Sequence, residues 1–528
     1  MLFRSRILAT ILNMVETRTE KSVRNAKVAL IFYLVQILLG FFSRKAFFDY
    51  LGSEILGLNT TVANLLGFLN LAELGIGTSV GYFLYKPLFE KDHEKINEIV
   101  SLQGWLYRKI AYFMLGVSAI LMVFFPLIFA KSPLSLWYSY STFGVLLFSS
   151  MLGYFFNYRQ IVLNADQKGY KIQIVVQGFV VVKTIIQILG ITYSAFPYVF
   201  WIVVELLSAV ITSFLLHRLL KKEYSWLKGN VACGKSYLKK YPEVLKKTKQ
   251  AFFHKMGGVI LSQSSPLVIY AFTSLSIVAL YGNYLLIVSK VGALMGAIFN
   301  STGAAVGNLV ASNDRKRIID VFWELSDSRM CISTICILCL FYLTNPLITL
   351  WLGANYCLGK DFLLLFIILT SISMLRTTVD SYIYAYGLFQ DVWAPVLEAV
   401  LNLGLSICLG YFWSLNGIVL GIILSQMIII LIWKPYFLFV KGIEVEASKY
   451  FVPTIFRYAG IFFLFVVTYF IFDYLQIETI SNLKQLIISS LYVFLICTVL
   501  TFGVFYLLFH GTRDFVSRLV TMFKRNNS

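Results

Sequence analysis

The sequence predicts an all-α polytopic membrane protein of about 14 transmembrane helices, forming two parallel six-helix lobes plus two extra C-terminal helices. Three observations predict this class: an apolar composition, an alternating charge pattern and an internal repeat. Apolar residues make up 59% of the 528 and charged residues 13%, and the mean hydropathy is +0.77. A soluble fold cannot cover so much apolar surface, whereas lipid can. The composition excludes soluble enzymes, disordered chains and secreted disulfide-rich domains.

Fourteen apolar segments approach or exceed the ~20 residues that cross a hydrocarbon core. They run over approximately 27–50, 56–85, 108–130, 136–160, 172–193, 196–219, 251–273, 276–311, 330–352, 361–386, 392–412, 415–439, 451–474 and 484–509. The longer segments must tilt or protrude from the bilayer. No stretch has the composition of an extramembrane domain.

Basic residues alternate between the connections in a way that fixes the topology. Of the 45 Lys and Arg, 37 fall on one side of the predicted membrane, and the richest connection is 220–250. This is the positive-inside pattern, so we expect both termini and the basic connections to be cytoplasmic. The net charge of +19 is therefore mainly a topology signal, and no nucleic-acid partner is expected.

A shift of 222 residues aligns 24–100 with 246–322 without a gap, and eleven positions match, among them Asp92 with Asp314. The offset spans six helices, so both copies have the same orientation, as in transporters whose lobes rock around a central cavity. The predicted organisation is a cytoplasmic N-terminal arm, an N-terminal lobe, a basic cytoplasmic linker, a C-terminal lobe, helices 13 and 14, and a basic cytoplasmic tail. These parts cover 1–26, 27–219, 220–250, 251–439, 451–509 and 510–528, respectively.

Catalytic and metal-binding signatures are weak. The four His have no Cys or carboxylate at catalytic spacing, and the seven Cys mostly fall in apolar runs. The segment Gly229–Ser236 fits the GxxxxGK[ST] pattern, but no strand precedes it, so we interpret the match as coincidence. We expect no enzyme activity, no metal and no cofactor.

Charged residues at membrane depth are the candidate functional residues, because each costs ~2.5–3.5 kcal/mol to insert and usually faces a cavity or a partner. The predicted substrate-binding cations are Arg44, Lys45, Lys183, Lys290 and Arg376. Lys183 and Lys290 have no acidic residue within a helical turn, which favours a cavity role. Several cations in one cavity suit an anionic cargo such as a phosphate-bearing lipid.

Four acidic residues at membrane depth have two open interpretations. Glu73, Glu205, Asp380 and Glu398 either bind a coupling cation, proton or sodium, or balance the cations. Arg376 and Asp380 stand at i,i+4 spacing and so also fit a self-neutralising pair. For Arg44 and Lys45, the alternative is snorkelling to the outer headgroups.

Several stretches resemble the polysaccharide-repeat (O-antigen or capsule type) lipid flippases of the multidrug/oligosaccharidyl-lipid/polysaccharide (MOP) exporter superfamily. They are Ser43-Arg44 with Tyr50-Leu51-Gly52, the run Leu71-Ala72-Glu73-Leu74-Gly75-Ile76-Gly77, and residues 398–425 with Asn402, Ser406, Gly417, Gly421 and Ser425. The resemblance implies that Arg44 and Glu73 match charged cavity sites of related lipid flippases. The second lobe departs from the pattern, because Pro266 stands at the equivalent of Arg44 and the charge is at Lys290 instead.

The resemblance implies a flippase that moves a polyprenyl-diphosphate-linked oligosaccharide across the cytoplasmic (inner) membrane by alternating access, in contact with polysaccharide assembly proteins. Two alternatives stay open from the sequence. One is a drug/cation antiporter of the same superfamily, which usually has twelve helices and an acidic cavity. The other is a membrane-embedded glycosyltransferase or polysaccharide polymerase, although the predicted outer loops are short.

Overall fold

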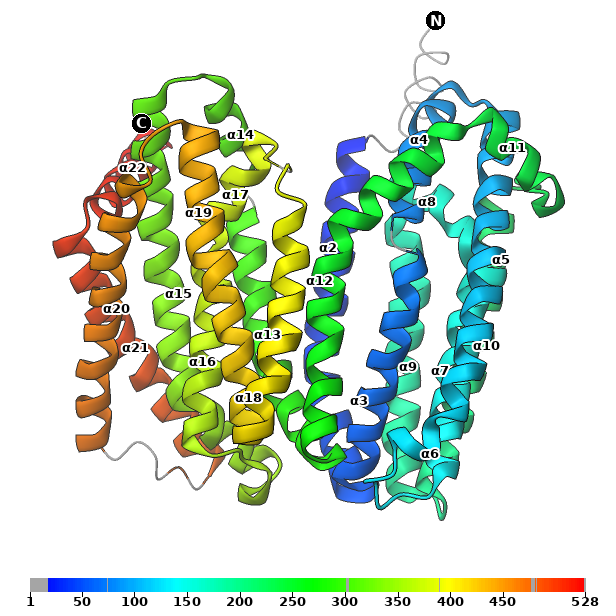
Figure 1. Ribbon diagram of the computed structural model, residues 1–528, viewed down its shortest axis with the longest axis horizontal. Coiled ribbons are helices and arrows are strands. Elements are labelled where there is room, and N and C mark those ends of the chain that lie inside the picture. Colours follow the sequence, from blue (N-terminus) through cyan, green and yellow to red (C-terminus); the bar gives the residue numbers. More distant parts are fainter. Residues whose placement is uncertain are drawn as a thin grey trace, which may run out of the picture. The chain divides into compact units, whose positions relative to one another are not determined.

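The computed structural model describes residues 18–73, 75–300, 303–388, 390–475, 480 and 482–526, and within these ranges every regular element is helical. Most of the predicted 1–26 arm lies outside the described residues. The chain divides into two compact units, Met1–Gln263 and Ser264–Ser528. Each unit is a bundle of long helices (Figure 1). The predicted all-α membrane fold is confirmed, while the finer domain boundaries stay predictions.

The first unit is built from long helices joined by short ones. The helices are α2 (Arg18–Tyr50), α3 (Gly52–Leu69), η1 (Asn70–Glu73), α4 (Ile76–Glu90), α5 (His93–Val123), α6 (Phe125–Ile128), α7 (Leu136–Phe155), η2 (Asn157–Gln160), α8 (Ile161–Ala165), α9 (Gly169–Tyr193), α10 (Pro197–Glu223), η3 (Val231–Cys233) and α11 (Gly234–Lys240). Helix α12 (Pro242–Phe272) begins in this unit. Helix α9 packs against both α2 and α10.

The second unit follows the same plan. Its helices are α13 (Leu275–Asn300), α14 (Gly303–Ala311), α15 (Arg315–Trp351), η4 (Ala354–Tyr356), α16 (Lys360–Leu375), α17 (Thr377–Tyr386), α18 (Trp393–Gln426), η5 (Met427–Trp433), α19 (Lys434–Phe437), η6 (Leu438–Ile443), α20 (Ser448–Tyr474), α21 (Leu483–Leu508) and α22 (His510–Asn526). Helix α15 packs against α16, α21 and α22.

Among the described residues, ten helical segments are long and apolar enough to cross a membrane. This supports a multi-pass membrane protein, and the count of fourteen stays a prediction. The longest segment, Trp393–Ile443, has 51 residues, more than twice the ~20 that one crossing needs. Non-helical backbone at Trp413 and Ser414, where Ser414 has a φ of 51°, interrupts it.

The interruption at Trp413 and Ser414 folds α18 into an antiparallel hairpin. Ser406 Oγ donates to the Ile418 carbonyl at 3.2 Å, on the opposite arm. Glycines allow this approach: a Cβ at Gly417 would lie 2.0 Å from the Leu409 carbonyl oxygen, and one at Gly421 2.5 Å from the Ser406 amide nitrogen. The 398–425 pattern that carried the family resemblance is therefore a close helix–helix packing motif.

The internal repeat is visible in the backbone of the two matched connections. Asp92 caps α5 by accepting from the Lys95 amide at 3.0 Å, and Asp314 caps α15 by accepting from the Arg317 amide at 3.1 Å. The residue before each cap is left-handed, with φ of 57° at Lys91 and 56° at Asn313. The 222-residue offset therefore joins two equivalent helix starts.

Two of the predicted continuous helices are broken in the structure. The 56–85 segment ends α3 at Leu69, passes through η1, and restarts as α4 after Gly75, whose φ of 93° favours glycine. The 361–386 segment is divided between α16 and α17 at Arg376. Both breaks coincide with charged residues chosen from the sequence, since discontinuous membrane helices place polar groups where regular ones cannot.

Candidate functional site

Lys183 and Glu205 form an ion pair between neighbouring helices of the first unit. The Lys183 ammonium on α9 lies 2.9 Å from Oε1 and 3.1 Å from Oε2 of Glu205 on α10. Gln187, one turn along α9, donates to Glu205 Oε2 at 2.9 Å and is 5% exposed. The predicted cation and the predicted acid are thus one charge-balanced cluster. The sequence left open that Glu205 balances a cation, but it did not identify Lys183 as the partner, because acidic neighbours of Lys183 were sought only within one helical turn.

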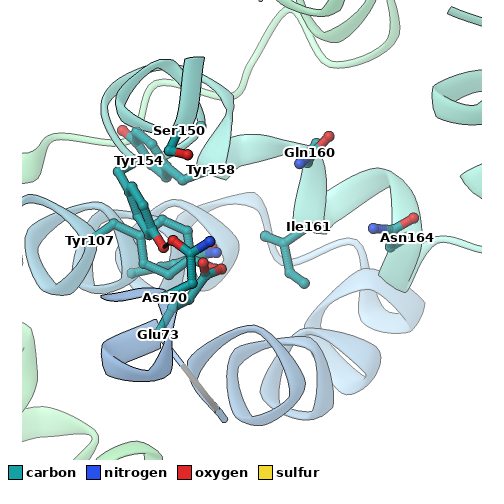
Figure 2. A pocket seen from close by; sticks show the side chains of 11 residues that line it. Asn70, Glu73, Tyr107, Ser150, Tyr154, Tyr158, Gln160, Ile161 and Asn164 are labelled. Carbon is teal, nitrogen blue, oxygen red and sulfur yellow. Dashed lines mark hydrogen bonds between the residues drawn. The ribbon is translucent and has the colours of Figure 1, made fainter. Parts of the chain in front are cut away.

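Glu73 lies at the break between α3 and α4 and lines a polar cavity of about 340 Å³. Tyr107 of α5 donates from its hydroxyl to Glu73 Oε1 at 2.6 Å. Tyr154 of α7 donates to Asn70 Oδ1 at 3.0 Å. Figure 2 shows these four side chains gathered on one side of the cavity.

One further polar atom at the cavity around Glu73 has no hydrogen-bond partner among the described residues. Gln103, which also lines the cavity, is 1% exposed, and its Oε1 has no hydrogen-bond donor there. A buried acceptor of this kind costs free energy unless water or a ligand satisfies it. The cavity therefore offers a carboxylate and amide oxygens, which are the acceptors that a proton or a hard cation needs.

Arg376, Asp380 and Glu398 come together in the second unit. Arg376 Nε lies 2.6 Å from Asp380 Oδ2, so the sequence-based pairing at i,i+4 is present. Glu398 on α18 is 7% exposed and is near enough to interact electrostatically with Arg376. The cluster contains one cation and two acids, and it stands at the break between α16 and α17.

The remaining predicted cations are placed on two other helices. Arg44, on α2, is partly buried, and the adjacent Lys45 makes an exposed ion pair with Asp49 at 3.2 Å. Lys290, on α13, is also partly buried. The cluster of Lys183 and Glu205 lies within the first unit, and the cluster of Arg376, Asp380 and Glu398 lies within the second. The assignment of all nine predicted residues to substrate or coupling roles stays a prediction.

The structure also buries charged residues that are not among the nine predicted site residues. Arg457 of α20 is 3% exposed and Asp327 of α15 is 0% exposed, and the two form a bidentate ion pair. The Gly511 amide, at the start of α22, donates to Asp327 Oδ2 at 3.2 Å. This pair therefore connects α15, α20 and α22, and only tertiary contacts reveal it.

Arg329 supports the helix break at Arg376. Arg329 is 4% exposed, and its guanidinium donates to the Thr377 carbonyl and Ser381 Oγ, both at 3.0 Å, and to the Phe299 carbonyl at 3.1 Å. The Thr377 carbonyl belongs to the first residue of α17. We interpret Arg329 as a residue that holds the discontinuous helix in place.

The GxxxxGK[ST] segment is not arranged as a phosphate-binding loop. It forms η3 and α11, and its amides at Asn230 and Ala232 donate to Ser101 Oγ and Asn230 Oδ1. A Cβ at Gly234 would lie 2.3 Å from Trp105 Cβ, so this glycine serves close packing against α5. At the last residue of α11, hydrogen bonding to Glu98 raises the pKa of Lys240. Among the described residues, no group of three or more His, Cys, Asp or Glu suits a metal ion.

Comparison with known proteins shows which solved structures share this fold. No protein-family model matches the chain, and no curated protein matches it by sequence. The structure of "Lipid II flippase MurJ, inward closed conformation" superposes with a TM-score of 0.61 at 15% identity, covering 92% of this chain and 100% of that one. An inward-facing "multidrug resistance MATE family transporter of the MOP superfamily" superposes with a TM-score of 0.54 at 13% identity, covering 77% and 96%. The chain has the fold of these proteins.

Proposed function

We propose that this protein is a transporter of the MOP superfamily that moves a lipid-linked anionic cargo across the cytoplasmic membrane by alternating access. The observation that carries the proposal is the fold likeness to a lipid II flippase along 92% of this chain and all of the other. Both termini are cytoplasmic in this proposal, as the charge alternation predicts.

The cargo that we propose is a polyprenyl-diphosphate-linked oligosaccharide, a polysaccharide repeat unit. Arg44, Lys45, Lys183, Lys290 and Arg376 would contact the diphosphate and acidic sugars through charge-assisted hydrogen bonds. A guanidinium has five N–H donors, so Arg376 can hold Asp380 through Nε and still contact a phosphate. Contacts with polysaccharide assembly proteins belong to the same proposal.

The cavity at Glu73 is our candidate for coupling to an ion. Its carboxylate faces Tyr107 in a cavity of about 340 Å³, where a proton or cation has several oxygen partners. Glu205, Asp380 and Glu398 each sit beside a cation, and these pairs would change their separation during transport. The chain itself would thus supply both the ion site and the charges that respond to it.

A drug/cation antiporter is the second candidate function, and the likeness to a MATE transporter supports it. The basic residues at membrane depth favour the lipid-linked cargo over this alternative. A membrane glycosyltransferase or polymerase has no support among the structural neighbours described above, which are transporters.

Deletion of the gene in its native host tests the proposal. We expect loss of surface glycan and accumulation of the lipid-linked repeat unit on the cytoplasmic side, restored by the wild-type chain. Arg44→Gln and Lys290→Gln should restore little export, whereas Lys86→Gln, which removes a charge with 77% side-chain exposure, should restore it fully. Normal glycan together with raised sensitivity to cationic drugs would favour the antiporter instead.

A further inference from the structure

Two adjacent cavities in the first unit are lined by cations that the transport proposal does not use. One, of about 490 Å³, is lined by Arg108, Arg159 and His217. The other, of about 230 Å³, is lined by Arg159, His217 and Lys221. The shared residues Arg159 and His217 make the cavities neighbours, and no carboxylate lines either of them among the described residues.

Nearby carboxylates are already balanced by other lysines. Glu223 accepts from Lys171 at 2.6 Å, and Asp166 lies 2.7 Å from Lys168. Tyr224, which lines the smaller cavity, donates its hydroxyl to Asp166 at 2.7 Å. Within the part of the chain that the structure describes, Arg108, Arg159 and Lys221 have no carboxylate partner. The cavities therefore carry an excess of positive charge.

Arg159 is held in a position to bind an anion. Its Nε donates to the Tyr158 hydroxyl and one terminal nitrogen donates to the Gly229 carbonyl, both at 3.3 Å. These contacts use two of the five guanidinium N–H donors, which leaves three for a ligand. Arg159 belongs to η2 and is partly buried, so these contacts set the position of its guanidinium before any ligand arrives.

Another part of the larger cavity's lining, residues 229–232, is also fixed before binding. Asn97 of α5 accepts from the Lys228 amide at 2.7 Å, and Ser101 accepts from the Asn230 amide at 2.8 Å. Trp226 stacks on His93 with ring centroids 3.9 Å apart. A wall that is already ordered costs little entropy on binding.

The location of these cations indicates where the anion comes from. Arg108, Arg159 and His217 fall at the cytoplasmic ends of the predicted spans 108–130, 136–160 and 196–219. The exposed ring of Phe156, 62% accessible, lines the same cavity. An aromatic ring beside cations at the end of a span is typical of the headgroup region of a bilayer.

We propose that these two cavities form a binding site for a negatively charged phosphate group, distinct from the transported cargo's site. The phosphate belongs either to an anionic phospholipid headgroup or to a soluble phosphate compound. Arg159 contacts it from the shared edge of the cavities, while Arg108 and Lys221 approach from the two sides. The inference goes beyond the transport proposal and does not depend on it.

Native mass spectrometry of the purified full chain in detergent tests the site with two kinds of probe. Dioleoyl phosphatidylglycerol and dioleoyl phosphatidylcholine, added separately at equal concentration, form the lipid arm, and inorganic pyrophosphate forms the soluble arm. We expect the Arg108→Gln/Arg159→Gln variant to lose about tenfold in affinity for the anionic probe. The matched control Arg218→Gln/Lys222→Gln removes the same charge nearby, from residues that line neither cavity, and should bind as the wild type does.

The outcomes separate the sources and can overturn the proposal. If Arg108→Gln/Arg159→Gln loses affinity for phosphatidylglycerol alone, the site binds a lipid headgroup. If it loses affinity for pyrophosphate alone, the site binds a soluble compound. The site is refuted if the control variant loses as much affinity as Arg108→Gln/Arg159→Gln does. It is also refuted if the wild type binds neither anionic probe more tightly than phosphatidylcholine. If Arg108→Gln/Arg159→Gln does not yield folded protein, His217→Gln/Lys221→Gln carries the same expectation without touching the Gly229 contact.

Discussion

Exchanging the charges of the Lys183–Glu205 pair tests whether Lys183 contacts cargo or only its partner. The two charged groups are 2.9 Å apart, with side chains 20% and 14% exposed. Their Coulomb attraction is about 6 kcal/mol at an effective dielectric of 20. Desolvation of the two charges offsets much of this attraction, so the informative quantity is the cost of removing one partner, about 3–5 kcal/mol.

We therefore expect Lys183→Met to lower the free energy of unfolding by about 3 kcal/mol or more, because Glu205 keeps its charge in a low-dielectric site. Lys183→Met/Glu205→Gln should recover most of this loss, since the new amide still accepts from Gln187 and no charge is left unpaired. Lys183→Glu/Glu205→Lys should also recover it, because the ion pair is restored in reverse. Thermal unfolding of the purified protein in one detergent measures all four chains.

Glycan export by the same variants then separates structure from function. A folded Lys183→Glu/Glu205→Lys protein that exports nothing places Lys183 among the cargo contacts. Full export by that protein removes Lys183 from the substrate-binding set and leaves it as the partner of Glu205. If Lys183→Met unfolds at the wild-type temperature, the pair is not a buried ion pair and the electrostatic reasoning is wrong.

Four further predictions follow from single sites. Gly421→Ala should destabilise the α18 hairpin by about 1–3 kcal/mol because the new Cβ would lie 2.5 Å from the Ser406 backbone. Gly404→Ala is the control: a Cβ there would have no neighbour within 4 Å, so this variant should be neutral or stabilising. Thermal unfolding measures both. Glu73→Gln keeps an acceptor for the Tyr107 hydroxyl, so we expect its free energy of unfolding to stay within about 1 kcal/mol of the wild-type value. We expect the same variant to lose gradient-driven export in vesicles, and unchanged export would contradict the coupling role. Asp327→Asn leaves Arg457 buried with its charge unbalanced and should cost about 3–5 kcal/mol, and a wild-type unfolding temperature would refute that burial. Burial raises the pKa of the Cys357 thiol, so less thiolate is present at neutral pH and maleimide labelling of this residue should accelerate from pH 7 to 9; a pH-independent rate would contradict this.

Helix content was predictable from the sequence because apolar segments of bilayer length have few alternatives in lipid. Backbone groups in hydrocarbon must be satisfied within the segment, so apolarity alone indicates a helix. The repeat was also readable, and its Asp92 and Asp314 match proved to be two helix caps. Breaks such as the one at Gly75 were not recognised, although the Leu-Gly-Ile-Gly sequence beside Glu73 is a local signal for one.

Side-chain partners were much harder to predict than helices. Lys183 and Glu205 are 22 residues apart, and Asp327 and Arg457 are 130 apart, so no rule of helical spacing connects them. The pair within one helix, Arg376 and Asp380, was found because i,i+4 residues share a face. Which cations are already balanced depends on how neighbouring helices are rotated, and packing sets that rotation.

By itself the sequence determined that the chain is an α-helical membrane protein with repeated halves, because hydropathy and helix caps act locally along the chain. Only the tertiary structure decided that α18 turns back on itself through Gly417 and Gly421 and that Glu73 faces a polar cavity. It also decided that Arg159 faces two cavities whose lining, among the described residues, contains no carboxylate. The physical reason is the range of the interactions. Hydrophobic transfer acts residue by residue, whereas charge balance and cavity shape depend on groups that only folding brings together.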